Sequence, residues 1–341
     1  MKRAIAFISG PIGPLLLVIV MMSIVMIVAG STPWAGFAAL FGGALGGTHE
    51  LAETLAQTTA LLFPALGLCL AFRAGLFNIG AEGQLLLGGL AAGALGANFA
   101  GPGWLAIPMI LAAGFIGGGL WGALAGWMKS RFNANEIIST LMLNYVAISI
   151  ANYLVAGPLK SPLASGAETA PLPAGSWLPS LIPDTRLTIA LLIAIAIAVI
   201  LQFVFTRTVF GYELRALGEA PEAARRNHVD INRLTWMVMG LSGAIAGLGG
   251  SAIVAGELHR FNTQLSPGYG FTAIAVALVG NLHPIWICLA AFGFGILESG
   301  GLAMQASAGV PKDAIHFIEG IIIVVLAARW YITTHVEVPA A

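Results

Sequence analysis

The sequence predicts an all-α, polytopic protein whose helices cross a membrane about ten times. Hydrophobic residues occupy 58% of the 341 positions, charged residues only 9%, and the mean hydropathy is +0.91. Soluble domains carry about 25% charged residues, and their interiors are too small to bury so many apolar side chains. These residues also form long uninterrupted runs, whereas a transmembrane barrel needs short alternating segments.

Each apolar run is close to the roughly 20 residues that a helix needs to cross a bilayer. The first run, 14–30, follows Lys2 and Arg3, and further runs come after it, so we expect a first transmembrane helix rather than a cleaved signal peptide. The segment 271–282 is short and could be a half-helix. The other predicted spans are approximately 54–76, 80–99, 104–128, 134–156, 187–206, 234–255, 271–282, 284–304 and 315–333.

The distribution of basic residues predicts the side on which each loop lies. With ten spans and a cytoplasmic N-terminus, the C-terminus is cytoplasmic too, and 11 of the 15 Lys and Arg residues lie inside. This excess agrees with the positive-inside rule. The proline-rich segment 157–186 is then an external loop, and 207–233, with nine charged residues, is a cytoplasmic loop. We expect the whole chain, 1–341, to form a single membrane domain.

Charge and motif content argue against several other classes of protein. The net charge is zero, so no overall field attracts nucleic acid. Cys69 and Cys288 stand alone in apolar runs, without the spacing of a metal or redox motif, and we expect them to be packing residues. The sequence contains no Walker lysine motif, HExxH or GxSxG. Nothing therefore predicts a catalytic or metal site.

Glycines recur at every fourth position in two of the predicted spans. Small residues at this spacing let two helix backbones approach closely. The pattern favours helix packing within the chain, with a subunit interface as the alternative. The glycines are Gly114, Gly118, Gly122 and Gly126 in one span and Gly243 and Gly247 in the other.

A polar stretch separates the second and third spans and predicts a broken helix near residues 75–84. Its three glycines weaken the helix, and broken helices at membrane depth form substrate sites in transporters. Asn78 could cap the next helix, with Glu82 in its first turn, where negative charge is favoured. Alternatively, or in addition, these side chains line a translocation path, because ionisable groups at this depth usually serve function. The candidate path residues here are Phe77, Asn78, Glu82 and Gln84.

A second polar cluster lies at residues 133–145. Glu136, Thr140 and Asn144 are four residues apart and share one helix face. A polar face on an apolar helix points inward, where it either lines the path or hydrogen-bonds between helices. Both alternatives stay open.

The segment 218–228 predicts a short cytoplasmic helix. Pro221 suits a first helical turn, and Glu222 early and Arg225 late match the helix dipole. Such a helix could fit a groove of a partner protein, and a solvated loop is the alternative. The candidate coupling residues are Gly218, Glu219, Glu222, Ala223, Ala224 and Arg225.

Together these segments resemble the permease subunit of an ATP-binding-cassette (ABC) importer, of the nucleoside type that works with basic-membrane-protein-type lipoproteins. Ribose-type sugar and branched-chain amino acid permeases resemble the chain more distantly. The similarity covers about residues 35–330, with departures at His228, where relatives commonly have glycine, and at Leu282. The matching segments are GLFNIGAEGQ (75–84), NEIISTLMLNY (135–145), GEAPEAAR (218–225), LSGAIAGLGG (241–250) and SPGYGFTAIAVALVG (266–280).

The resemblance implies a function and its partners. The chain would form the path for nucleosides or nucleobases through a bacterial cytoplasmic (inner) membrane, and would not be an enzyme. An external substrate-binding lipoprotein would deliver the solute, a second permease would complete a heterodimer, and ABC ATPase subunits would grip the 218–228 helices. ATP and Mg²⁺ would bind those ATPases, and this chain would bind no cofactor.

Two alternatives are kept. The first is a simple-sugar permease of the same machine, because Asn, Glu and Gln hydrogen-bond a ribose or a base equally well. The second is a self-sufficient secondary transporter, which needs carboxylates at mid-depth. Glu82, Glu298 and Glu319 are candidates for that role, but the charged 207–233 loop is then unexplained.

Overall fold

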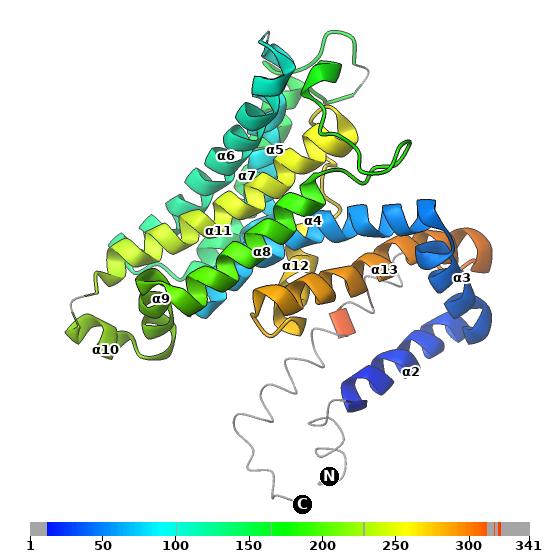
Figure 1. Ribbon diagram of the computed structural model, residues 1–341, viewed down its shortest axis with the longest axis horizontal. Helices are drawn as coiled ribbons and strands as arrows, with labels where there is room; N and C mark the ends of the chain where they lie inside the picture. The colour runs from blue at the N-terminus through cyan, green and yellow to red at the C-terminus, as the bar shows by residue number, and fades with distance from the viewer. Residues whose placement is uncertain are drawn as a thin grey trace, which may run out of the picture. The chain divides into compact units, whose positions relative to one another are not determined.

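The structure is a computed structural model that describes residues 12–99, 101–164, 166–227 and 229–311, and the single positions 317, 320 and 321. The described residues form helices and no named strand, which confirms the all-α prediction (Figure 1). The helices are α2 (Ile12–Val28), α3 (Pro33–Leu45), α4 (Thr48–Arg73), α5 (Ala81–Asn98), α6 (Gly103–Phe132), α7 (Glu136–Ala156), η1 (Ala174–Ser176), α8 (Ala190–Arg207), α9 (Val209–Glu219), α10 (Pro221–Arg226), α11 (Ile231–Ile253), η2 (Val254–Leu258), α12 (Tyr269–Val279) and α13 (Pro284–Ala308).

Six of the described helices are long and apolar enough to cross a membrane, namely α4, α6, α7, α8, α11 continued by η2, and α13. The bent pair α2 and α3 would make a seventh, with an angle of 109° between the two parts. The segment near 271–282 is a short helix of 11 residues, as expected for a half-helix. The number ten is thus not confirmed, and the predicted span 315–333 falls almost entirely outside the described residues.

Helix α3 was not expected from the apolar runs. Its start has clear local signals, because Pro33 occupies the first turn and the Thr32 hydroxyl accepts a hydrogen bond from the Ala35 amide at 3.3 Å. Proline is favoured in a first turn and threonine at an N-cap. The predicted first span therefore ends in a sharp bend, and Thr32 and Pro33 begin the next helix directly after it.

The chain divides into two compact units, Met1–Gln57 with Gly293–Ala341, and Thr58–Phe292. In the first unit, Met22 and Met26 of α2 pack with Leu40 of α3 and with Met304 and Val310. The second unit holds every segment that the sequence singled out as a path or coupling candidate.

The second unit is built on a glycine-lined contact between α6 and α11. A β-carbon on Gly118 would lie 2.6 Å from the Gly247 Cα, and one on Gly247 would lie 2.7 Å from the Gly118 Cα. Helix α5 joins the same contact, because Gly88 is in close contact with the Gly247 backbone. The glycine repeat therefore packs helices within the chain, as expected, and it brings three backbones closer than any side chain would permit.

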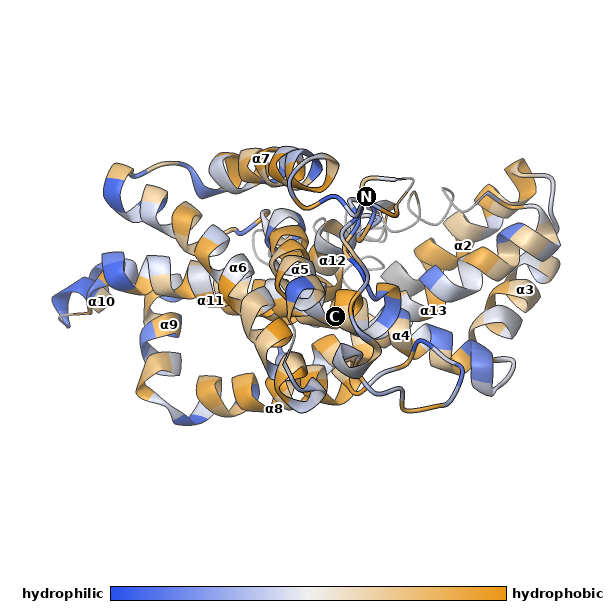
Figure 2. Cartoon of the chain, turned by 90° about the horizontal axis from the view of Figure 1, so that it is seen from above, coloured by the Kyte–Doolittle hydropathy of each residue, from blue (hydrophilic) through white to orange (hydrophobic). Residues whose placement is uncertain are grey.

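The two long polar segments, 157–186 and 207–233, lie at opposite ends of α11. Helices α9 and α10 precede its first residue, and Figure 2 shows α10 in the hydrophilic colour. At the other end, the Leu178 amide donates to Ala255 O at 2.9 Å, and the Leu172 amide to His259 O at 2.7 Å. The Trp177 ring stacks on His259 with 3.8 Å between centroids. Residues 168–178 thus form a cap on the far end of α11.

Candidate functional site

The helix is broken between α4 and α5, as the sequence predicts. Helix α4 ends at Arg73, Gly75 takes a positive φ of 70°, and α5 begins at Ala81. The N-cap residue of α5 is Gly80, with no side-chain cap hydrogen bond, so the expectation that Asn78 caps this helix is wrong. The Asn78 side chain instead accepts a hydrogen bond from the Gly80 amide at 2.9 Å, which closes a turn just before the helix.

Asn78 and Gln84 form a buried amide pair. The Asn78 Nδ2 donates to Gln84 Oε1 and to the Ser242 hydroxyl of α11, both at 2.9 Å, and Gln84 Nε2 donates back to Asn78 Oδ1 at 3.1 Å. Their exposed fractions are 0% and 1%. Both donors of Asn78 are used, so this amide ties the broken segment to α11.

Helix α7 supplies the bonds that the non-helical backbone needs. Asn144 Nδ2 donates to Ile79 O and Asn144 Oδ1 accepts from the Gly83 amide, both at 2.9 Å. The Thr140 hydroxyl accepts from the Ile79 amide at 3.1 Å and donates to Glu136 O at 2.6 Å. Irregular backbone at membrane depth persists only where protein or water satisfies its polar groups. Hydrogen bonding between elements is thus what Thr140 and Asn144 do here.

Glu82 lies where the N-termini of two helices meet. It is in the first turn of α5, and its Oε2 accepts from the Gly270 amide in the first turn of α12 at 2.8 Å. The Ser266 hydroxyl also hydrogen-bonds to it. A β-carbon on Gly270 would lie 2.5 Å from the Glu82 Cα, so only glycine permits this approach. Helix N-termini carry partial positive charge, so the dipoles of α5 and of α12 both favour negative charge at the Glu82 side chain.

Two predicted path residues have other surroundings. Glu136 forms an ion pair with Lys129 of α6 at 2.9 Å. Phe77 is 53% exposed, and its ring centroid lies 5.5 Å from that of Phe72. Contact of any predicted path residue with a solute stays a prediction, but Phe77 alone among the seven has a mostly open side chain.

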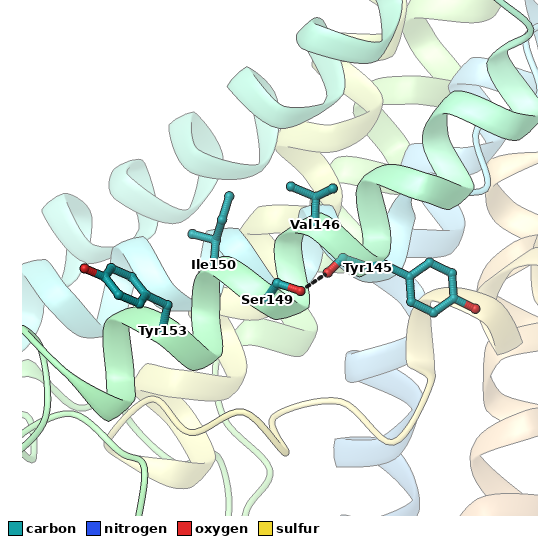
Figure 3. Close-up of a pocket in the computed structure, with 5 residues that line it drawn as sticks. All are labelled: Tyr145, Val146, Ser149, Ile150 and Tyr153. Carbon is teal, nitrogen blue, oxygen red and sulfur yellow. Dashed lines mark hydrogen bonds between the residues drawn. The ribbon is translucent and has the colours of Figure 1, made fainter.

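A hollow of about 400 Å³ lies on the outer face of α7 (Figure 3). Its lining residues are Tyr145, Val146, Ser149, Ile150 and Tyr153. Sequence reasoning had marked only the buried face of this helix. The spacing of Tyr145, Ser149 and Tyr153, four residues apart, was the signal that could have identified the outer one.

The predicted coupling residues fall on two helices rather than one. Helix α10 begins at Pro221 and carries Glu222 in its first turn and Arg225 in its last, as expected, with Ala223 within it. Gly218 and Glu219 instead end α9, because Ala220 departs from helical geometry with φ −149° and ψ 70°. The Glu222 and Arg225 side chains are 80% and 68% exposed, whereas Ala224 is buried.

The end of α9 touches the start of the broken segment. A β-carbon on Gly218 would lie 3.1 Å from the Gly75 amide nitrogen, and one on Gly75 would lie 3.2 Å from the Gly218 Cα. The neighbouring Arg73 donates through Nε to Leu282 O at 2.7 Å, and its guanidinium lies 4.6 Å above the Phe205 ring of α8. We call Arg73, Gly75 and Gly218 the junction. Sequence reasoning had used Arg73 only to orient the chain.

Cys69 lies in the protein interior, as expected for a packing residue, and Cys288 is partly buried. Cys69 is fully buried, and its Sγ donates to Leu282 O at 3.0 Å, beside the Arg73 bond to the same oxygen. Among the described residues, no group of three or more His, Cys, Asp or Glu side chains could hold a metal ion.

Residues 50–327 match the family model described as the permease component of the branched-chain amino acid transport system. The chain belongs to this permease family. It is 33% identical to the guanosine ABC transporter permease protein NupP of Bacillus subtilis, over 97% of this chain and 96% of the relative. It is 34% identical to the glucose ABC transporter permease protein TsgB13 of Haloferax volcanii, over 86% and 80% of the two chains.

A third relative is the nucleoside ABC transporter permease protein NupB of Lactococcus lactis, 31% identical over 91% of this permease and 88% of the relative. Two bacteria in this set contain a second matching permease each, NupQ in B. subtilis and NupC in L. lactis, at 28% and 26% identity. No solved structure matches this chain. Membership of a permease family and several apolar helices make this a multi-pass membrane protein that acts as a transport component.

Proposed function

We propose that this permease forms the translocation path for nucleosides or related nucleobases in an ABC importer of a bacterial cytoplasmic membrane. The observation that carries the proposal is the match to a guanosine permease over 97% of this chain and 96% of the relative. The nucleoside permease of L. lactis supports it independently. A sugar is the second candidate solute, because the glucose permease of H. volcanii is similar at 34% identity.

The experiment is uptake by cells that express the whole operon, with this chain present or deleted. The labelled solutes are guanosine, adenosine, uracil, ribose and glucose. Loss of guanosine and adenosine uptake alone on deletion is the expected result. Loss of ribose or glucose uptake alone would reject the nucleoside assignment in favour of the sugar.

The partners follow from the same assignment. An external lipoprotein delivers the solute, and ATPase subunits bind ATP and Mg²⁺. A second permease completes a heterodimer, a proposal supported by the paired permeases NupP with NupQ and NupB with NupC in their own organisms. Purification of the complex through a tag on this chain, with subunit masses measured, tests this composition.

Helix α10 is the surface to which the ATPase docks. It projects exposed charges at one end of α11, opposite the cap formed by residues 168–178. We expect Glu222→Lys to abolish uptake while the permease stays folded and inserted, because the reversed charge would face the groove of the ATPase in which α10 docks. Arg207→Glu, a charge reversal on an exposed residue at the end of α8, is the matched control. Normal uptake by the Glu222 variant would reject this docking surface.

The junction connects the docking surface on α10 mechanically to the broken segment at residues 75–84. Movement of α9 and α10 reaches the broken segment through the contact of Gly218 with Gly75, and Arg73 holds that contact against α8 and Leu282. Asn78, Glu82 and Gln84, with Glu136, Thr140 and Asn144 of α7, then fix the shape of the path wall beside Phe77. In this proposal the buried polar residues position the wall.

A further inference from the structure

Two charged residues flank the broken segment, one at the end of α4 and one at the start of α5. Arg73 is the last residue of α4, and Glu82 is the second residue of α5. Glu82 hydrogen-bonds to the first turn of α12, and Arg73 to the turn that follows the last residue of α12. The break, both flanking residues and all of α12 lie in the second unit, Thr58–Phe292. The broken segment and α12 are therefore joined at two points.

Glu82 holds the N-terminal end of α12. Its Oε2 accepts from the Gly270 amide at 2.8 Å, and the Ser266 hydroxyl also hydrogen-bonds to the carboxylate. The Ser266 Oγ accepts in turn from the amide of Tyr269, the first residue of α12, at 2.9 Å. Glu82 is 7% exposed, so these bonds are largely shielded from water. The carboxylate thus fixes the start of α12 both directly and through Ser266.

The turn after α12 has an unusual backbone that α4 holds in place. Asn281 and Leu282 both take a positive φ, 50° and 53°, which is uncommon for leucine. Such a conformation persists where the surrounding structure fixes it. The Leu282 carbonyl accepts from Arg73 Nε at 2.7 Å and from Cys69 Sγ at 3.0 Å, both on α4. The Leu282 amide donates to Ala277 O at 3.0 Å, which ties this turn to the last turn of α12.

A helix and a non-helical segment differ in how far their ends can separate. The nine peptide units from Arg73 to Glu82 could extend to about 30 Å, so the break alone does not fix the distance between α4 and α5. Helix α12 has 11 residues and is about 16 Å long, and it cannot stretch without losing its own hydrogen bonds. Bonds from both of its ends to the flanking residues therefore limit the length of the break.

We propose that α12 with the turn after it, residues 269–282, is a strut that holds the two ends of the broken segment at a fixed separation. Arg73 and Glu82 are the positioning residues that attach it. Because Arg73 belongs to the junction, movement of α9 and α10 reaches the strut at one end and the start of α5 at the other, without passing through the flexible break. The consequence for transport rests on the proposed function, whereas the strut itself does not.

The first test is amide hydrogen exchange of the complete importer in lipid nanodiscs, without solute. Arg73→Ala is expected to raise exchange at residues 268–271, the far end of α12, by about fivefold, the effect of losing one typical hydrogen bond. Glu82→Ala is expected to do the same at residues 280–283. Exchange that rises only beside the altered residue would overturn the strut.

Three further variants make this exchange test specific. Glu168→Gln removes a 2.8 Å ion pair with Arg260 in the same unit, and as the matched control it leaves exchange at both ends of α12 unchanged. Glu82→Gln keeps an oxygen that can accept from Gly270, so exchange at residues 280–283 is expected to stay within about twofold of the unmodified chain. Ser266→Ala removes one of the two links to Glu82 and is expected to raise exchange at 280–283 if Glu82→Ala does not assemble. An effect of Glu168→Gln as large as that of Glu82→Ala would count against the strut.

The second test is the amount of guanosine taken up per ATP hydrolysed in proteoliposomes. Arg73→Ala and Glu82→Ala are each expected to lower this ratio at least about tenfold, whereas loss of folded importer would lower uptake and hydrolysis together. A strut released at one end transmits nothing, so the double variant is expected to lie within about twofold of the weaker single variant. Independent roles at distant sites multiply instead, and a ratio about a hundredfold lower in the double variant would overturn the strut.

Failure of the strut and failure of the proposed function are distinguishable. If deletion of the chain abolishes only sugar uptake, the nucleoside assignment fails, and the exchange test still decides the strut because it uses no solute. If deletion abolishes guanosine uptake while the exchange changes stay beside the altered residues, the function stands and the strut is rejected.

Discussion

Replacement of Gly247 by alanine tests the packing on which the second unit depends. The new β-carbon would lie 2.7 Å from the Gly118 Cα and 2.9 Å from the Gly118 nitrogen, and would also press on the Gly114 carbonyl. These are backbone atoms of α6, so no flexible side chain can yield. The 2.7 Å contact is about 0.7 Å short of an ordinary 3.4 Å contact, and α6 and α11 must separate by at least that amount, because the Gly114 carbonyl oxygen is closer still.

The cost follows from the loss of packing along the contact. A gap of 0.5–1 Å forfeits about a quarter to a half of each dispersion contact, and inserting a methyl group into a packed core costs about 1–3 kcal/mol. We therefore expect the free energy of unfolding to fall by about 1–3 kcal/mol, roughly a 5- to 150-fold change in the unfolding equilibrium.

The measurement is reversible unfolding in mixed detergent micelles with increasing sodium dodecyl sulfate, followed by circular dichroism. Gly293→Ala is the matched control, because it lies in helix α13 with nothing within 4 Å of a β-carbon. Equal unfolding free energies for the Gly247 and Gly293 variants would refute the close-contact argument.

Three further predictions concern the junction, the amide pair and the cap. Arg73→Lys keeps the charge but loses the guanidinium above the Phe205 ring and its hydrogen bond to Leu282 O, so we expect ATPase binding to persist while uptake falls at least about tenfold; unimpaired uptake would contradict the junction. Asn78→Ala leaves the bonded groups of Gln84, Ser242 and Gly80 unpaired, at about 1–3 kcal/mol each, so lower stability is expected together with lower uptake; an unfolding curve like that of the unmodified chain would contradict it. Burial, and less strongly the charge of Arg260, lower the pKa of His259 from 6.5, against the Ala255 carbonyl, which raises it. Near and below pH 6.5 the unfolded chain then binds more protons, so stability is lost as the pH falls. After correction for the intrinsic pH dependence of exchange, the protection of residues 168–178 from hydrogen exchange should fall between pH 7.5 and 5.5 but stay constant in His259→Gln.

Local pattern was enough to predict several elements. Long apolar runs with 9% charge specify membrane helices, since no soluble interior could hold them. Glycine at every fourth position predicted a close contact, and α6 and α11 make it. Pro221 with Glu222 and Arg225 predicted a short helix, and α10 begins at that proline. Each of these signals is contained within one helix.

The candidate site was predictable in composition but not in its bonds. The polar residues at 78, 82, 84, 140 and 144 were expected to face inward, but the sequence does not identify their hydrogen-bond partners. The fold decides that Asn78 reaches Ser242 and that Glu82 reaches Gly270, over 164 and 188 residues of separation. The number of spans was harder to predict, because a helix such as α5, with three polar side chains and several glycines, is covered by other helices, and its hydropathy alone does not identify it as a span.

By itself, then, the sequence determined the membrane class, most of the helices, the break at residues 75–84 and the family, because hydropathy, glycine spacing and capping act over a few residues. Only the tertiary structure decided which face of α7 is occupied by hydrogen bonds and which is open, that α9 touches Gly75, and that Arg73 holds α4 to α8. Those outcomes depend on which backbones approach one another, and glycines far apart in the chain set that distance.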